Sequence, residues 1–252
     1  MRAATGTRLP GRYATGAARL IDLHPAGGDT APDAGDAAAR AVLSAAELRR
    51  AGSFRDPAAA TTYIRARAAV RRVLAEALRR PAAEVPLTAE PGGRPVLPAH
   101  PDWSVSWSRS AGVLLVAVRY GGPVGVDVEV VRPVRRAARV LGTFYPKAPD
   151  LGELDDPEAF FSAWTLLEAA VKASGRGLAR GARDVRLVRR PGARRCALGG
   201  IRGTDSPLWS GRTDHFTVAP RPAPGRHARA RTVMTAVVTD AAFPPPPPEV
   251  TP

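Results

Sequence analysis

The chain has 252 residues, a length that fits one large domain or two small ones. Its hydrophobic fraction of 44% excludes a wholly disordered chain, and its single cysteine, Cys196, excludes an intramolecular disulfide framework and a cysteine-based zinc cluster. The formal net charge of +14 concentrates anionic partners, but it does not choose among nucleic acid, polyphosphate ligands and acidic proteins.

The start of the chain carries arginines but no sustained apolar segment, and no run of about 18 apolar residues occurs anywhere in the sequence. The sequence therefore predicts neither a secretory signal nor a membrane span. A single cysteine also fits a reducing compartment. We expect a cytoplasmic protein without a membrane partner.

Loop-like composition dominates the first part of the chain. Residues 1–19 are expected to be flexible, and residues 27–36 are expected to form a loop because glycine, proline and aspartate dominate them. Ser44 and Glu47 then have the spacing of a capping box, in which each side chain satisfies a free backbone donor of the other residue. This spacing predicts a short helix.

A longer helix is predicted to begin near Asp56 and Pro57 and to end before Pro81. The signal for its start is a capping residue followed by proline in the first turn. Arg67 and Arg71 are four residues apart and should therefore share one face of this helix.

Alternating or continuous apolar segments predict strands in the middle of the chain, at residues 103–108 and 113–118, with another after Gly121-Gly122-Pro123. An apolar helix is expected over 158–174, ending near two glycines. The later expectations are strands at 185–188, 216–219 and 232–238, and a disordered polyproline tail around 244–248.

Two carboxylates share one face of the strand after Pro123. In residues 124–130 the valines alternate with Gly125, Asp127 and Glu129, and side chains two apart on a strand point the same way. Two like charges so close repel each other unless solvent or a cation lies between them. Oxygen ligands of this kind suit a hard ion such as Mg²⁺, but for this segment alone a solvated strand face is the simpler interpretation.

The apolar helix adds charges where charges are costly. Trp164, Glu168 and Lys172 lie at i, i+4 and i+8, so they stand above one another on a helix that is apolar nearly all round. A buried Glu and Lys require a partner or a bound charged group. A simple i,i+4 salt bridge explains the pair but not its place in so apolar a helix.

Two segments together resemble the paired signatures of the 4′-phosphopantetheinyl transferase superfamily, of the large, pseudo-dimeric, surfactin-synthetase-activating type. They are Gly125-Val-Asp-Val-Glu129 and Trp164-Thr-Leu-Leu-Glu-Ala-Ala-Val-Lys-Ala-Ser-Gly-Arg-Gly-Leu178. Residues 43–49, 63–71 and 93–97 look like the N-terminal landmarks of the same family.

The resemblance implies an α/β (α+β) fold of two pseudo-symmetric subdomains with the active site at their interface. The expected division is an N-terminal α/β half over 1–121, a C-terminal α/β half with the metal site over 122–240, and a disordered tail over 241–252. It also implies a monomer that imitates a dimer.

The resemblance further implies that Asp127, Glu129 and Glu168 hold Mg²⁺ on the pyrophosphate of coenzyme A. Lys172 would contact a phosphate, and Glu168 would be the base for the serine hydroxyl of a carrier protein. Arg94 stands where the family has a basic phosphate-binding residue before proline. The products would be the holo-carrier protein and adenosine 3′,5′-bisphosphate, as in a holo-[acyl-carrier-protein] synthase.

The sequence departs from the family pattern at two places. Leu167 stands where the family has lysine, and Ser106-Trp107-Ser108 stands in place of a Ser-His-Ser element whose histidine meets the 3′-phosphate of coenzyme A. Arg109, Arg94 or the Arg67/Arg71 face would supply the missing charge, and Trp107 would stack on adenine. A core or rim aromatic is the alternative for Trp107.

A transferase also gives the basic charge a use, because carrier proteins are typically acidic around the modified serine. The expected pathway class is secondary metabolite biosynthesis. A catalytically impaired carrier-binding relative remains an alternative because of Leu167 and Trp107. A basic nucleic-acid-binding protein is a weaker one, because the arginines are dispersed and no nucleic-acid-binding motif accompanies them.

Overall fold

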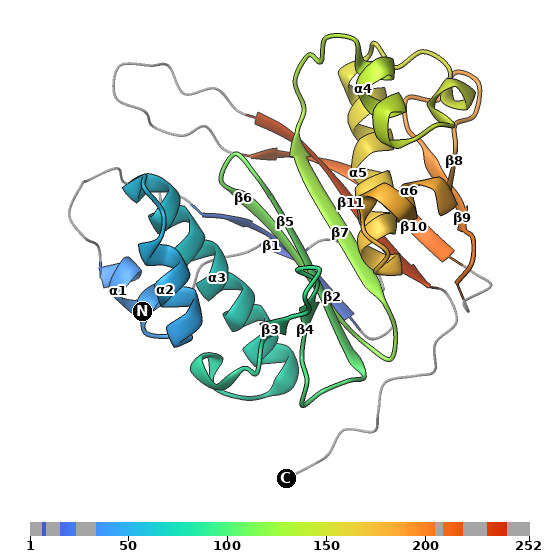
Figure 1. Cartoon of the computed structure of the whole chain (residues 1–252). Helices are drawn as coiled ribbons and strands as arrows, with labels where there is room; N and C mark the ends of the chain where they lie inside the picture. Colours follow the sequence, from blue (N-terminus) through green and yellow to red (C-terminus); the bar gives the residue numbers. More distant parts are fainter. Residues whose placement is uncertain (1–6, 9–15, 24–33, 205–208, 219–230, 241–252) are drawn as a thin grey trace, which may run out of the picture.

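The computed structural model describes residues 7–8, 16–23, 34–204, 209–218 and 231–240 (Figure 1). Its strands pair antiparallel throughout. The first sheet has the order β1 (Thr7–Arg8), β2 (Gly16–Asp22), β6 (Val113–Tyr120), β5 (Trp103–Ser110), and the second has the order β10 (Trp209–Val218), β11 (Arg231–Asp240), β7 (Val124–Val130). Two small hairpins are formed by β3 (Thr88–Ala89) with β4 (Pro95–Val96) and by β8 (Val185–Val188) with β9 (Ala197–Ile201).

The helices lie to the two sides of these strands in Figure 1. They are α1 (Ala34–Arg40), α2 (Ala45–Gly52), α3 (Pro57–Leu78), α4 (Ala137–Phe144), α5 (Pro157–Ser174) and α6 (Leu178–Asp184), with short 3₁₀ turns at Ala82–Glu84 and Ala148–Leu151. This mixture of helices and antiparallel sheets confirms the expected α/β (α+β) class. The pseudo-symmetry and the division at residue 121 stay predictions.

The local signals for the main helices are confirmed. Ser44 and Glu47 form both bonds of the capping box before α2. The side chain of Asp56 caps α3. Helix α5 ends at Gly175, whose positive φ of 69° lies in the left-handed region that glycine adopts without strain.

Two expectations about loops are wrong where the structure describes the residues. Within 1–19, Thr7–Arg8 and Gly16 onward are strands, and within 27–36 the last three residues begin α1. Strand β2 forms because it pairs along its length with the apolar strand β6, a partner almost 100 residues away. The predicted polyproline tail lies outside the described residues.

Three apolar clusters stack through the molecule. Helix α3 packs on one face of the first sheet, the two sheets pack on each other, and α5 with α4 and α6 packs on the second sheet. The valines of β7 belong to the middle cluster, as their alternation predicts. The opposite face of β7, which carries the two carboxylates, therefore faces α5.

Helix α5 rests directly on the backbone of β7. A Cβ atom on Gly125 would lie 1.9 Å from the carbonyl oxygen of Ala169 and 2.5 Å from the nitrogen of Ala173. Because both neighbours are backbone atoms, neither can move without moving the helix. Only glycine permits this approach, and it sets the height of α5 above β7.

Arg71 joins α3 to the elements around it. Its side chain is 2% exposed, and its Nε donates to Glu47 of α2 at 2.7 Å. Its Nη1 donates to the carbonyl oxygens of Ala82 and Val85. The guanidinium is therefore a buried structural cross-link between α2, α3 and the turn after α3.

We expect Gly125→Ala to lower the free energy of unfolding by about 3 kcal/mol or more, because overpacking against backbone cannot relax by a side-chain rotation. Urea denaturation of the purified chain measures the change. Gly142→Ala on α4 is the matched control, since nothing lies within 4 Å of its position. That control should be neutral or stabilising by up to about 1 kcal/mol, and an equal loss in both variants would contradict the packing argument.

We expect Arg71→Met to destabilise the protein by about 3–5 kcal/mol, because it leaves Glu47 buried without its counter-charge. Arg72→Met is the control, because Arg72 lies one residue further along α3 with an exposed side chain. The control should change the free energy of unfolding by less than about 0.5 kcal/mol. Thermal and urea melts that do not separate the two variants would rule out the cross-link.

Candidate functional site

Asp127 of β7 lies buried between a serine of β5 and a lysine of α5. It is 4% exposed, and its Oδ1 accepts hydrogen bonds from Ser108 Oγ at 2.6 Å and from Lys172 Nζ at 2.7 Å. Its Oδ2 is buried and finds no hydrogen-bond partner among the described residues. Burial raises the pKa of this carboxyl above its ordinary value, against the lowering effects of Lys172 and Ser108.

Glu129 lies two residues further along β7 and is more open to solvent. Its Oε2 accepts a hydrogen bond from Ser110 Oγ at 2.7 Å and lies 3.7 Å from Arg132 Nη1. The two carboxylates share one face, as the alternation predicts, and each is held by a serine of β5.

Helix α5 brings Glu168 and Lys172 to the same place. The Lys172 ammonium donates to the carbonyl oxygen of Val126 at 3.2 Å as well as to Asp127. Burial raises the pKa of Glu168, Lys172 opposes this rise, and the charges of Asp127 and Glu129 add to it. The three carboxylates therefore lie close enough to repel one another, with the Lys172 ammonium among them.

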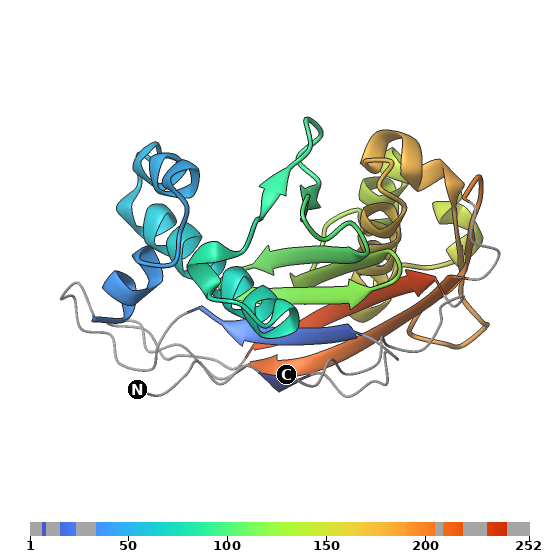
Figure 2. The ribbon, with the colours of Figure 1, turned by 90° about the horizontal axis from the view of Figure 1, so that it is seen from below.

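A cavity of about 840 Å³ opens beside this cluster. Glu168 and Lys172 line one wall, and the β3–β4 hairpin with Trp103 to Trp107 lines the other. In Figure 2 the hairpin stands away from the sheets, between the α3 side of the molecule and α5. The predicted residue Arg94 lines the cavity at the end of this hairpin, and its guanidinium packs against Gly175 at the end of α5.

The Ser-Trp-Ser segment lies partly in this cavity. Ser106 and Trp107 are lining residues, whereas the hydroxyl groups of Ser106 and Ser108 are turned to β7. Trp107 packs against the α3 cluster, and Arg67 lies over its ring at 4.7 Å. The Nη1 of Arg67 is buried without a hydrogen-bond partner among the described residues.

The remaining predicted residues lie outside the cavity. Arg67 and Arg71 share a helix face, as predicted, and both contact Glu47, but neither is part of the described lining. Arg109 is exposed on β5 and is also not part of it. Leu167, where the family pattern has lysine, is fully buried in the core on another face of α5.

The residues present fit a hard cation in part. Within the described residues, no group of three or more His, Cys, Asp or Glu side chains closes around one point in the manner of a complete metal site. The buried and unpartnered Oδ2 of Asp127, however, is a free anionic ligand beside two further carboxylates. Mg²⁺ needs few protein ligands because it keeps waters and binds substrate phosphate.

Sequence reasoning missed the part played by the serines of β5. Ser108 and Ser110 alternate like Asp127 and Glu129, with the same separation of 19 residues in each pair. This equal spacing was the available signal, but it has meaning only once β5 is known to lie against β7.

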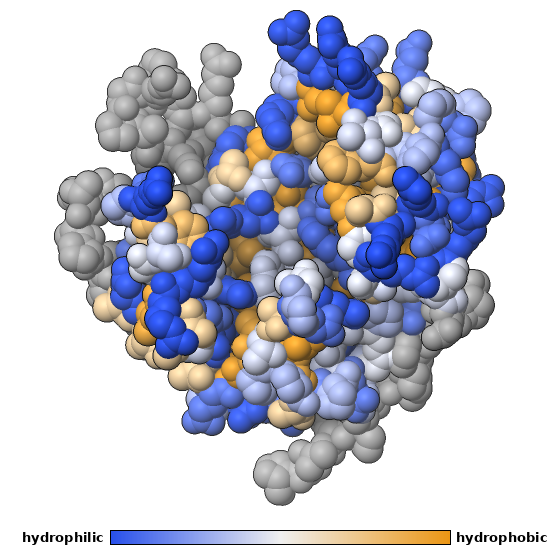
Figure 3. Space-filling view, viewed as in Figure 1, coloured by the Kyte–Doolittle hydropathy of each residue, from blue (hydrophilic) through white to orange (hydrophobic). Residues whose placement is uncertain are grey.

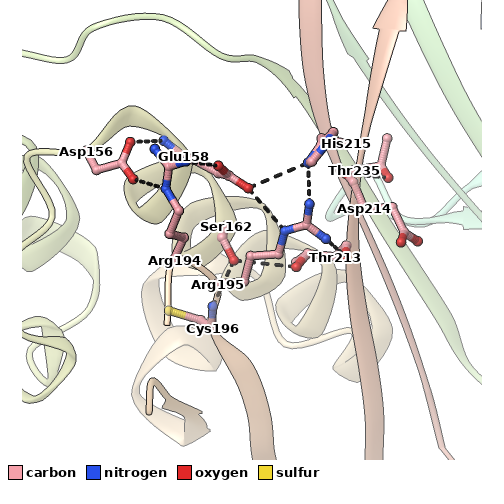
Figure 4. A network of polar contacts seen from close by, with 10 residues as sticks. All are labelled: Asp156, Glu158, Ser162, Arg194, Arg195, Cys196, Thr213, Asp214, His215 and Thr235. Atoms are coloured by element: carbon pink, nitrogen blue, oxygen red, sulfur yellow. Dashed lines mark hydrogen bonds and ion pairs between the residues drawn. The ribbon is translucent and has the colours of Figure 1, made fainter. Parts of the chain in front are cut away.

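A second polar network lies at the other end of α5 (Figure 4). Arg194 pairs with Asp156 at 2.9 Å, and Arg195 pairs with Glu158 at 3.2 Å. Since a helix rises about 1.5 Å per residue, this network lies about 21 Å from Lys172 along the axis. Burial raises the pKa of the nearby Cys196 thiol to about 11, so it is no nucleophile at neutral pH.

In the part of the chain that the structure describes, no helix combines the length and the apolar character that a membrane crossing requires. The expectation of a cytoplasmic protein stays a prediction.

Comparison with known proteins finds similarity in the segment that holds Asp127, Glu129, Glu168 and Lys172. Residues 123–220 match the family model of the 4′-phosphopantetheinyl transferase superfamily. The 4′-phosphopantetheinyl transferase HetI of Nostoc sp. (strain PCC 7120 / SAG 25.82 / UTEX 2576) is 30% identical over 148 residues, which cover 56% of this chain and 62% of HetI. The protein slr0495 of Synechocystis sp. (strain ATCC 27184 / PCC 6803 / Kazusa), provisionally assigned the same activity, is 27% identical over 157 residues, covering 58% and 62%.

The chain thus spans about three fifths of the length of these relatives. Asp127, Glu129, Glu168 and Lys172 all lie inside the matched segment, whereas Arg94 and the Ser-Trp-Ser element lie before it. The large, pseudo-dimeric type stays a prediction. Over residues 123–220, the chain is therefore similar to members of the 4′-phosphopantetheinyl transferase superfamily.

Proposed function

We propose that the protein is a Mg²⁺-dependent 4′-phosphopantetheinyl transferase that modifies a serine of an acyl or peptidyl carrier protein with coenzyme A as donor. One observation carries the proposal: the Lys172 ammonium and a buried, half-free Asp127 carboxylate meet beside a cavity that Glu168 and Lys172 line, within the segment that matches the family. The carrier type and the pathway belong to the proposal as well.

The residues divide the work as follows. Asp127 Oδ2, Glu129 and Glu168 would hold the cation, which when bound supplies positive charge to neutralise the pyrophosphate as its bridging bond breaks. Lys172 binds a phosphate oxygen from the cavity wall, and Arg94 offers a second positive charge across the cavity. The volume of about 840 Å³ is within the range of cofactor sites.

Glu168 takes the proton of the incoming serine hydroxyl, directly or through one water. The serine oxygen forms a bond to the phosphorus that carries pantetheine, and the bond from that phosphorus to the bridging oxygen breaks. Adenosine 3′,5′-bisphosphate leaves with the bridging oxygen. The proton ends on Glu168 and passes to solvent.

A surface on α4 fits the acidic carrier. Val140 and Phe144 lie four residues apart, so they share a face, and they are 37% and 40% exposed. Phe144 packs edge to face on Trp164 of α5. In the α4 region of Figure 3, apolar surface lies among hydrophilic surface.

Four exposed arginines precede Val140 in the sequence, namely Arg132, Arg135, Arg136 and Arg139. Arg132 also lies 3.7 Å from Glu129, so at least one of these arginines is beside the carboxylate cluster. A carrier that is acidic around its serine would dock there with complementary charge and would bring the serine toward Glu168.

The transferase activity is tested with the purified chain, coenzyme A, Mg²⁺ and apo-carrier proteins of several kinds, read as the mass gain of the carrier. We expect transfer that stops when the metal is chelated and returns when Mg²⁺ is added. Asp127→Ala and Glu168→Gln should each lower the rate at least about 100-fold while the far-ultraviolet spectrum is kept. Glu153→Gln, which changes an exposed carboxylate before α5, is the control and should keep full activity.

Failure to modify any of several acyl and peptidyl carriers would overturn the proposal. Normal turnover by Asp127→Ala would overturn the assignment of the cation ligands alone.

The docking surface is tested by Phe144→Ala, which should raise KM for the carrier about tenfold and leave KM for coenzyme A and kcat unchanged. Val188→Ala is the matched control, because Val188 is 39% exposed on β8 and lies outside the surface on α4. Raising salt from low to physiological concentration should weaken carrier association, since exposed charges are screened within about 8–10 Å. An unchanged KM for Phe144→Ala, or indifference to salt, would place the carrier elsewhere.

A further inference from the structure

Three serines of β5 face β7 at alternate positions. Ser106, Ser108 and Ser110 share one face of the strand, because side chains two apart on a strand point the same way. β5 and β7 are edge strands of the two sheets, and the three serine hydroxyl groups form hydrogen bonds from β5 to β7.

The three hydroxyl groups do not do the same thing. Ser106 Oγ accepts a hydrogen bond from the backbone N–H of Val126 at 3.1 Å. Ser108 Oγ and Ser110 Oγ instead donate to the carboxylates of Asp127 and Glu129, at 2.6 and 2.7 Å.

The direction of the Ser110 O–H bond is restricted by a second hydrogen bond. Its oxygen already accepts a hydrogen bond from the backbone N–H of Val130 at 3.2 Å. The donated bond to Glu129 therefore follows from the position of the β7 backbone, and Glu129 is tied to the same strand that carries it.

Asp127 is held more tightly still. Two donors, Ser108 and Lys172, meet at its Oδ1, so rotation of the carboxylate would break both bonds. The second oxygen, Oδ2, is consequently fixed in direction while it stays buried and unpartnered among the described residues.

We propose that Ser108 and Ser110 are positioning residues, which hold one oxygen of Asp127 and of Glu129 so that the other oxygen is turned to a divalent cation. This inference rests on the proposed function, because it needs the cation. Neither serine touches the reacting atoms. Ser106 lines the cavity, so the control is Ser162 of α5, a buried hydroxyl that accepts a hydrogen bond from the backbone N–H of Cys196 at 2.9 Å in the second polar network.

The test is a Mn²⁺ titration of the full chain with coenzyme A present, followed by the electron paramagnetic resonance signal of free Mn²⁺. Loss of a hydrogen-bond partner behind a metal ligand typically costs 10–100-fold in affinity. We expect Ser108→Ala and Ser110→Ala to weaken Mn²⁺ binding about tenfold or more, and Ser108→Thr, which keeps the hydroxyl donor, to recover most of the loss. Ser162→Ala should bind Mn²⁺ as the wild type does, even if it melts at a lower temperature.

The Asp127→Ala variant shows how much of the Mn²⁺ binding comes from the proposed cation site. If wild type and Asp127→Ala bind Mn²⁺ equally, the cation site of the proposed function is wrong, and the positioning role is overturned with it. If wild type binds more tightly than Asp127→Ala but the Ser108 and Ser110 variants match wild type, only the positioning role is overturned.

An equal loss in Ser162→Ala would also overturn the positioning role, since it would show that loss of a buried hydroxyl acts through the fold alone. Thermal melts of every variant identify any that is unfolded at the assay temperature. Should Ser108→Ala be one of them, Ser110→Ala decides the question, because Ser110 is half-buried at the end of β5.

Discussion

The contact between α5 and the bare backbone of β7 at Gly125 sets the geometry on which the site depends. Because no Cβ intervenes, the helix comes close enough for Lys172 on its C-terminal half to place its ammonium 2.7 Å from Asp127. A carboxylate as buried as Asp127 is costly unless charge and hydrogen bonds compensate it, and Lys172 and Ser108 supply both. The close packing of α5 on β7 and the pairing of Lys172 with Asp127 therefore depend on the same contact at Gly125.

The parts of the fold that sequence reasoning found are those with local signals. The capping box before α2, the Asp-Pro start of α3 and the glycine after α5 each involve residues within a turn of one another. Strand β2 has no such signal, since it exists through pairing with β6. Helix α4 was also missed; its start at Arg136 has positive φ and no side-chain cap.

The same distinction applies to the site. The carboxylates of β7 and the pair Glu168 and Lys172 followed from periodicity, because two apart on a strand and four apart on a helix are fixed distances. The roles of the arginines did not follow, because they depend on partners far along the chain. Arg71 was expected near coenzyme A, yet its donors bind Glu47, Ala82 and Val85, whereas Arg94 reaches the cavity by packing on Gly175. Phosphate contacts by Arg67, Arg71, Arg109 and the Ser-Trp-Ser segment stay predictions.

The junction of β5 with β7 has a consequence for how the two sheets respond to mutation. A backbone ladder forms whatever side chains it carries, so it tolerates substitution along its length. Here the edges are bridged by the hydroxyl groups of Ser106, Ser108 and Ser110, so the bridge depends on the side chains at three positions. The middle apolar cluster also joins the two sheets. A substitution at one of these serines therefore weakens only the polar link, and the two helix-covered cores stay coupled through the apolar one.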